Sequence, residues 1–197
     1  MRDKLAALTR PRRLLVAAGA LLLLAGALLA GQNLLTERRA ARQTADLLAA
    51  VETRIAAPAD LPAPEVTGDP WAGYEVIGVV GLPDLGLSLP VLADYTQDLL
   101  AVAPCRYTDD LALEPGQLVV AGHNYRTHFG RLGELAPGSR ITWQNLDGVT
   151  YTYTVTEVTE IDAGDREALE QGDWDLTLFT CDVTRTRRIL VRAALET

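Results

Sequence analysis

The sequence is poor in the side chains that most often carry chemistry. Its 197 residues contain two cysteines, Cys105 and Cys181, and two histidines, His123 and His128. A single lysine, Lys4, stands near the N-terminus, so the remainder of the chain has no primary-amine side chain. A site that uses a thiol or an imidazole can therefore be built from only four residues.

Internal repeats and low-complexity tracts are absent as well. A chain of this length, of which 48% is hydrophobic, can bury one sizeable core but not two. We therefore expect one globular domain.

Positive charge is scarce beyond the first residues. Of the 18 basic and 26 acidic residues, five basic and one acidic lie in residues 1–13, which leaves 13 basic and 25 acidic residues after them. The formal net charge of that part is −12. Because phosphate binding needs a basic surface, we expect no nucleic-acid partner. The acidity is most simply explained by solubility.

One uninterrupted apolar run, LLVAAGALLLLAGALLA, fills residues 14–30. A cleaved signal peptide has a shorter apolar region of about 7–15 residues and a small-residue site, which Ala25-Gly26-Ala27 could imitate. A membrane anchor needs about 17–25 residues. The length of the run favours an uncleaved anchor over residues 14–31. No cysteine stands directly after the run, which argues against a lipoprotein.

The basic residues on either side of the run predict its orientation. Five Lys and Arg precede it, whereas Arg38, Arg39 and Arg42 follow it together with Glu37. The positive-inside bias places residues 1–13 in the cytoplasm. We expect a single-pass protein of the cell membrane with an extracellular domain.

Two patterns fill residues 32–73. Apolar residues at helical spacing within residues 36–57 predict a helical stalk. Four prolines then predict a stiff extended connector. The compact domain is expected over residues 74–197. The pattern-bearing residues are Leu47, Leu48, Val51 and Ile55 in the stalk and Pro58, Pro62, Pro64 and Pro70 in the connector.

Strand patterns dominate the compact domain. Several segments are rich in β-branched and aliphatic residues and bounded by Gly and Pro, whereas YTQDLLAV predicts one short helix. Asp147-Gly148 predicts a hairpin. Eight or so short strands with few helices favour a closed β-barrel or a sandwich. The predicted strand segments are 74–83, 85–92, 117–124, 141–146, 150–158, 175–181 and 187–195.

The second cysteine has a basic neighbourhood. Outside the membrane, two cysteines are most simply a structural disulfide. Cys181, however, ends an apolar strand segment and is followed by Arg185, Arg187 and Arg188. Positive charge favours the thiolate, the reactive form of cysteine. Cys105 has no comparable cluster and is interpreted as a small buried residue.

His123 ends the predicted strand QLVVAGHN. A lone histidine there is usually a satisfied polar group, but beside a cysteine in a barrel it becomes a candidate general acid and base. His128, in RTHFGRL, is interpreted as a loop residue.

Strand alternation selects one arginine. Ile189 and Val191 must share one face of their strand, so Arg188 lies on the other. If the apolar face lines the core, Arg188 points outward beside Cys181, and Arg187 falls on the apolar face. The alternative is a solvated strand arginine.

Together these motifs resemble those of the sortases, the membrane-anchored cysteine transpeptidases of mainly Gram-positive bacteria. The resemblance covers roughly residues 74–195, and GHNYRTHFGRL is similar to the segment that contains the family's histidine. The family's T-L-x-T-C pattern, its histidine and its arginine are matched by Thr177, Leu178, Thr180 and Cys181, by His123 and by Arg188.

The resemblance implies an eight-stranded β-barrel and a two-step acyl transfer. The Cys181 thiolate would cleave an LPXTG-like sorting signal of a secreted protein through a thioester and pass the acyl group to an amine of a peptidoglycan precursor or a pilin lysine. His123 would be the general acid and base. Arg188 would stabilise the oxyanion or hold the signal, and Thr180 and Asn124 would bind substrate. No metal ion or other cofactor is expected.

Two other functions stay open from the residues alone. One is a cysteine peptidase of the same fold in which water resolves the thioester. The other is a non-enzymatic anchored module with a disulfide between Cys105 and Cys181. Within the family, the lack of an apolar segment after Thr197 and of a clear lid motif resembles an anchoring enzyme more than the pilin-polymerising branch.

Overall fold

The chain divides into two compact units, Met1–Arg39 and Ala40–Thr197. Helix α1 (Arg2–Ala56) contributes to both. The predicted proline-rich connector lies outside the described residues. The structure, a computed structural model, describes residues 2–56, 74–107, 117–170, 172, 174–182 and 184–196.

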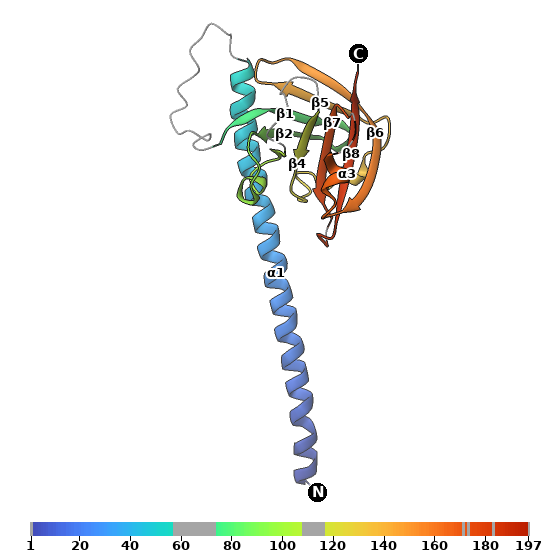
Figure 1. The fold of residues 1–197 in the computed structure, drawn as a ribbon. Helices are drawn as coiled ribbons and strands as arrows, with labels where there is room; N and C mark the ends of the chain where they lie inside the picture. The colour runs from blue at the N-terminus through green and yellow to red at the C-terminus, as the bar shows by residue number, and fades with distance from the viewer. Residues whose placement is uncertain are drawn as a thin grey trace. The chain divides into compact units, whose positions relative to one another are not determined.

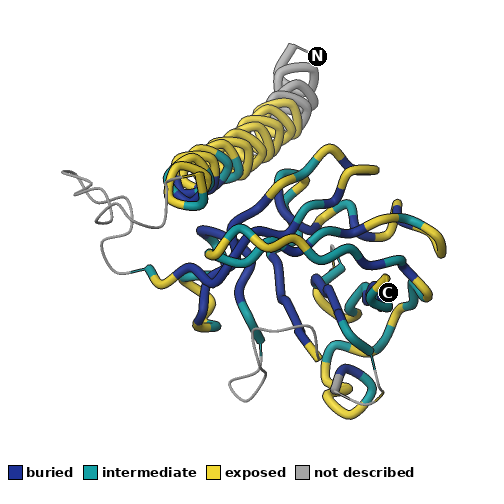
Figure 2. Tube along the Cα trace, turned by 90° about the horizontal axis from the view of Figure 1, so that it is seen from above, coloured by how far each residue is buried: buried dark blue, intermediate teal, exposed yellow. Residues whose placement is uncertain are grey.

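The first unit is the N-terminal part of α1. Its side chains are exposed from Leu14 to Thr36, as the yellow stretch of helix in Figure 2 shows. With a mean hydropathy of 2.5 over its most apolar window, α1 is long and apolar enough to cross a membrane. The predicted anchor at residues 14–31 lies within this helix.

Eight strands of the second unit close into a barrel (Figure 1). Their order is β1-β2-β3-β4-β7-β8-β6-β5, and β5 pairs back with β1. The closed barrel, rather than a sandwich, is therefore the correct one of the two predicted architectures. The strands are β1 (Val76–Leu82), β2 (Leu87–Leu92), β3 (Cys105–Arg106), β4 (Leu118–Ala121), β5 (Arg140–Asn145), β6 (Thr150–Asp162), β7 (Leu176–Cys181) and β8 (Arg187–Leu195).

Two parallel pairings interrupt an otherwise antiparallel barrel. β2 runs parallel to β3, and β4 runs parallel to β7. Each of the seven predicted strand segments overlaps a strand, and the predicted helix contains α2 (Gln97–Leu100). The hairpin between β5 and β6 turns at Gly148, whose φ of 80° favours glycine. Two short 3-10 helices, Pro83–Leu85 and Leu132–Glu134, and helix α3 (Arg166–Glu170) complete the described elements.

The buried apolar side chains form two clusters. One cluster, here called the interior cluster, takes alternate residues from seven strands and from the loops at the ends of the barrel. Because side chains alternate between the faces of a strand, these residues point into the closed barrel. Trp143 and Tyr153 are its largest strand residues, each 1% exposed, and Leu178 and Val191 lie beside them with no exposure.

The second cluster, here called the outer cluster, lies on the opposite face of the strands. Phe179 of β7 and Leu190 of β8 belong to it, one residue along from members of the interior cluster. Leu47 and Val51 of α1 pack into the same cluster. The helix therefore covers part of the outer face of the barrel.

This packing changes the interpretation of residues 36–57. The apolar residues that predicted a stalk are the ones that contact the barrel: Leu47 and Val51 are buried, and Leu48 and Ile55 are half-buried. Ala40 and Thr44 extend the same buried stripe at helical spacing. From Ala40 onward the helix belongs to the same compact unit as the barrel.

Truncation of a helix residue at this contact will destabilise the barrel unit. Leu47→Ala removes a side chain that is only 2% exposed, so we expect the free energy of unfolding to fall by about 2–5 kcal/mol. Glu52→Ala, on the exposed face of the same helix, is the control and should change it by less than about 0.5 kcal/mol. Urea unfolding of the full chain in micelles measures both. Equal, small effects of the two substitutions would mean that the helix does not pack on the barrel.

Candidate active site

The pairing of β4, β7 and β8 brings three predicted site residues to one end of the barrel. Cys181, the last residue of β7, is directly opposite Arg188 on β8. In the parallel pair of β4 and β7, Ala121 lies beside Phe179. Continuing that register by two residues brings His123 level with Cys181.

A pocket of about 100 Å³ opens where these residues meet. None of the residues that line it is acidic, although the chain beyond residue 13 carries a formal net charge of −12. A negatively charged reaction intermediate would thus meet positive charge and no opposing carboxylate in the lining. The lining residues are Tyr95, Gln97, Leu100, Ala121, Gly122, His123, Asn124, Phe179, Cys181, Arg185 and Arg188.

Arg188 presents donors without partners. Its guanidinium lies over the ring of Phe179, 5.3 Å from the centroid. The Nε and Nη1 atoms are buried, and neither has a hydrogen-bond partner among the described residues. Buried unsatisfied donors are costly, so they are suited to bind an oxygen of a ligand.

Arg187 lies elsewhere. Its Nε atom is 3.3 Å from a carboxylate oxygen of Glu160, and both side chains are about half exposed. The alternation predicted from the sequence is confirmed for the apolar residues of β8: Val191 belongs to the interior cluster and Leu190 to the outer cluster. Arg188 therefore shares the outer face with Cys181.

His123 is held by stacking. Its ring is 3.8 Å from that of Tyr125, with an angle of 17° between the planes. The buried Nδ1 atom has no hydrogen-bond partner in the described part of the chain. Burial lowers the pKa of His123, the nearby charge of Arg185 lowers it further, and the side chain of Asn124 acts in the opposite direction. The neutral imidazole therefore predominates at pH 7.

The loop after His123 is tight, and its sequence explains why. A Cβ atom on Gly122 would overlap the ring of Phe129, which belongs to the interior cluster. Only glycine allows Phe129 to enter the barrel so close to the backbone. The amides of Phe129 and His128 donate to the carbonyls of His123 and Tyr125, at 3.1 and 2.9 Å. These bonds fold residues 122–130 back on themselves.

The two predicted substrate-binding residues have different locations. Asn124 lines the pocket, and its Nδ2 atom donates to the carbonyl of Asp182 at 3.3 Å. Thr180 does not line it, because strand alternation turns its side chain to the face opposite Cys181, where it is 1% exposed. Thr180 faces the barrel interior beside Ile189 of β8, so the structure does not bring it to the pocket.

The loop between β7 and β8 is organised by Asp182. Its carboxylate accepts from the hydroxyl of Thr184 and from the amide of Arg187 at 3.0 Å. Arg185, at the tip, has a φ of 60°, in the left-handed region that favours glycine. The turn directs the Arg185 side chain to the pocket lining.

The two cysteines do not form a disulfide. Both are free thiols, Cys105 fully buried and Cys181 half-buried. The thiol of Cys105 donates to the carbonyl of Ala103 at 3.4 Å, and burial raises its pKa to about 12. Cys105 is thus the small buried residue that the sequence predicts, and the disulfide-bonded module is not supported.

Sequence reasoning missed Tyr95 and Gln97 of the pocket lining, and it named Arg185 only as one of the basic residues after Cys181. Burial raises the pKa of Tyr95, and the neighbouring phenol of Tyr107 and thiol of Cys181 raise it further. Arg185 belongs to the basic cluster after Cys181, which was a usable signal. Tyr95 precedes a short helix far from the cysteine in sequence, and no local pattern marks it.

Comparison with known proteins agrees with this geometry. A sequence model of the Sortase domain matches residues 80–196. Sortase A of Bacillus anthracis is 30% identical to this chain over 111 residues, which are 54% of this chain and 52% of that protein. The chain thus spans about half the length of this relative.

Solved sortase structures share the fold. Sortase A of Listeria monocytogenes superposes with a TM-score of 0.57 at 26% identity, covering 62% of this chain and 88% of that one. Sortase A of Corynebacterium diphtheriae gives 0.58 at 22% identity, covering 65% and 64%. The second likeness concerns the fold alone.

Thiol counting tests the state of the cysteines. Without reductant, we expect two titratable thiols in the denatured chain and one fast-alkylating thiol in the native chain. The fast thiol is Cys181, because Cys105 is fully buried and alkylation needs an accessible thiolate. Cys181→Ala should remove the fast phase and leave one thiol. A denatured chain without free thiols would instead require the disulfide.

Removal of the Arg185 charge will raise the pKa of His123. A nearby positive charge disfavours imidazolium, so Arg185→Gln should move the His123 titration to higher pH. The chain has only two histidines, so NMR titration of the imidazole Cε1 protons resolves both curves. Arg187→Gln is the matched control, because Arg187 pairs with Glu160 and does not line the pocket. A shift in the control as large as that in Arg185→Gln would contradict this assignment.

Proposed function

This chain belongs to the sortase family, and we propose that it is a membrane-anchored cysteine transpeptidase that cleaves a sorting signal and transfers the acyl group to an amine. The proposed nucleophile is Cys181, the proposed general acid and base is His123, and Arg188 is proposed to stabilise the oxyanion.

One observation carries the proposal. A cysteine faces an arginine across β7 and β8, in a pocket that also contains a histidine, and two buried donors of the arginine have no partner in the described part of the chain. These three groups supply the nucleophile, the proton carrier and the positive charge that acyl transfer needs. A structural role for Arg188 alone would predict partners for its buried nitrogens.

The first step forms a thioester. The Cys181 thiol gives its proton to His123, and the thiolate attacks the carbonyl carbon of the scissile peptide bond. The tetrahedral intermediate collapses as the C–N bond breaks, and the His123 imidazolium gives the proton to the leaving amine. The acyl group stays on the sulfur, and the C-terminal fragment departs.

The second step resolves the thioester. An incoming amine attacks the carbonyl carbon, and neutral His123 accepts a proton from it. The C–S bond breaks, an amide forms, and the proton on His123 returns to the sulfur. The lowered pKa of His123 suits this step, because the imidazole must be neutral to act as a base.

Arg188 acts while charge is on the carbonyl oxygen. Its Nε and Nη1 atoms have no other partner among the described residues and can donate to the oxyanion. Packing over Phe179 fixes the guanidinium on the outer face of β8. Asn124, which lines the same pocket, is proposed to contact the bound signal.

The proposed substrate is an LPXTG-like sorting signal of a secreted protein, cleaved at the threonine carbonyl. The proposed acceptor is an amine of a cell-wall precursor or a pilin lysine. Helix α1 would anchor the enzyme in the cell membrane with residues 1–13 in the cytoplasm and the barrel outside.

Three substitutions test the catalytic roles. Cys181→Ala should abolish cleavage of an LPXTG-like peptide, because no thioester can form. His123→Ala should lower kcat/KM by about 10²–10⁴-fold as the proton carrier is lost. Arg188→Ala should lower kcat by about 10²–10³-fold, the cost of one oxyanion donor. Product release from a fluorogenic peptide measures all three.

Arg187→Ala is the control for Arg188, because it removes the same charge one residue away and leaves the pocket lining intact. It should retain near wild-type kcat/KM. Activity that survives Arg188→Ala but is lost in Arg187→Ala would reverse the assignment of the two arginines. Mass spectrometry of products with and without an added amine separates transfer from hydrolysis by water.

A further inference from the structure

One buried hydroxyl connects helix α1 to the pocket. Thr44 is 4% exposed, and its Oγ1 atom lies 2.8 Å from Nε2 of His128 and 2.6 Å from the carbonyl oxygen of Val102. The same oxygen is 2.9 Å from the carbonyl of Ala40, one turn earlier in the helix. A single side chain thus joins three segments that are far apart in sequence.

The donor and the acceptor in the hydrogen bond between His128 and Thr44 can be assigned. Its ring is fully buried, and burial together with the neighbouring His123 lowers its pKa to about 4, so the ring is neutral at pH 7. The buried Nδ1 atom has no partner among the described residues, so a proton there would be an unsatisfied donor. The proton therefore belongs on Nε2, which donates to Thr44, and Thr44 donates to Val102.

The His128 end of this chain of hydrogen bonds leads to His123. The ring of Tyr125 meets that of His128 edge-on, with 5.5 Å between centroids. The other partner of Tyr125 is the ring of His123, stacked at 3.8 Å. Because Nδ1 of His123 has no hydrogen-bond partner in the described structure, this stack contributes to the orientation of the imidazole.

The hydrogen bond to Val102 connects Thr44 to a second segment that lines the pocket, the one around α2. Val102 follows α2, and its amide donates to the carbonyl of Leu99 at 2.8 Å. Tyr95, Gln97 and Leu100, in and next to α2, all line the pocket. The Thr44 hydroxyl therefore bonds both the segment that carries these residues and the loop that carries His123.

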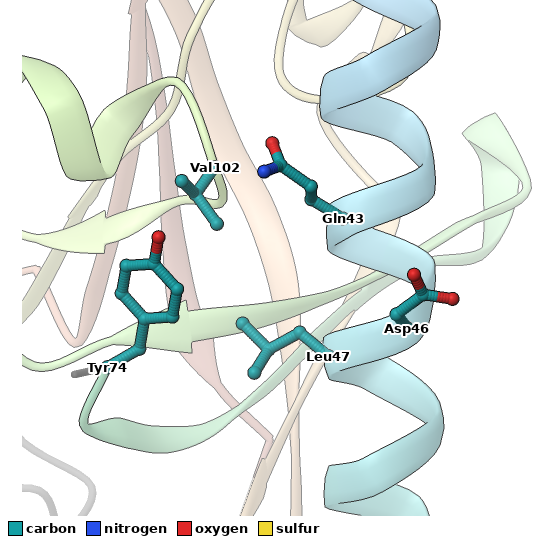
Figure 3. Close-up of a pocket in the computed structure, with 5 residues that line it drawn as sticks. All are labelled: Gln43, Asp46, Leu47, Tyr74 and Val102. Atoms are coloured by element: carbon teal, nitrogen blue, oxygen red, sulfur yellow. The ribbon is translucent and has the colours of Figure 1, made fainter. Parts of the chain in front are cut away.

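Val102 belongs to the outer cluster together with Leu47 of the helix, but the packing between them is incomplete. A cleft of about 180 Å³ remains beside it, lined by Gln43, Asp46, Leu47, Tyr74 and Val102. Figure 3 shows Gln43 and Leu47 reaching from α1 toward Val102 and Tyr74 across this cleft. The hydrogen bond from Thr44 adds a directional contact between the helix and Val102 to this packing.

We propose that Thr44 and His128 are positioning residues of the active site and that the helix segment Ala40–Ala56 is a structural component of it. The proposal rests on the proposed role of His123. Loss of the Thr44 hydroxyl leaves the His128 donor and the Val102 carbonyl without their partner. Both the His123 loop and the α2 segment then shift relative to Cys181.

The kinetic test separates the hydroxyl from packing. Thr44→Val keeps the shape and removes the hydroxyl, and we expect kcat for peptide cleavage to fall by roughly 10–100-fold with little change in KM. Thr44→Ser keeps the hydroxyl and removes a methyl group. It should therefore keep most of the wild-type kcat, while its Tm should be lower. Each variant is assayed as the full chain in micelles, well below its own Tm.

Thr53→Val is the matched control. Thr53 lies on the same helix and makes the same bond to the residue four positions earlier, from Oγ1 to the carbonyl of Ala49 at 2.7 Å, but it is exposed. Its substitution should leave kcat unchanged. A Thr44→Ser variant as slow as Thr44→Val would overturn the proposal, because the methyl packing would then be what matters.

An NMR measurement tests the same inference without activity. The two histidines give two ring signals, and Thr44→Val should shift both and move the His123 titration, whereas Thr53→Val should shift neither. Unchanged histidine signals in Thr44→Val would contradict the proposal. If the wild-type chain cleaved no sorting-signal peptide, the proposed function would fail, and the histidine signals would still decide whether Thr44 positions His123.

Discussion

Closure of the barrel is the constraint on which the candidate site depends. In a closed barrel one face of every strand is interior, so the residues of β7 and β8 must divide between interior and outer faces. Leu178 and Val191 take the interior face, which leaves Cys181 and Arg188 outside, paired in register. A slip of one residue between the strands would break this pairing and bury the wrong side chains.

The outer face needs a cover because it is apolar as well. Phe179 and Leu190 would be exposed without one, and Leu47 and Val51 of α1 pack into the same cluster. The pocket lies where this cover ends, with Leu100 and Phe179 belonging to both. The site thus lies at the edge of a hydrophobic contact, where two nitrogens of Arg188 are buried without a hydrogen-bond partner among the described residues and the residue still lines the pocket.

Local patterns predicted the parts of the fold that follow local rules. Alternation gave seven strand segments and separated Arg188 from Arg187, and Asp147-Gly148 marked the hairpin. β3 was missed because two residues are too short for any period to show. The helical spacing of apolar residues in 36–57 predicted a helix with one apolar face. This spacing carries no information about which part of the chain packs against that face. The packing of this face on the barrel could therefore not be predicted from the sequence.

The least predictable features depend on contacts between distant segments. His128 was interpreted as a loop residue, and it does lie in a loop, but it is fully buried and hydrogen-bonded to Thr44, 84 residues earlier. Tyr95 reaches the pocket because β2 and β3 run parallel and leave α2 beside the end of β7. Neither relation has a counterpart in the local sequence.

The most direct test of the account is mass spectrometry of the full chain after brief incubation with an LPXTG-like peptide and no amine acceptor. The account predicts a covalent adduct with the mass of the acyl fragment, attached to Cys181, and its loss when an amine is added. An adduct on Cys105, or cleavage of the peptide by the wild-type protein without any adduct, would contradict it.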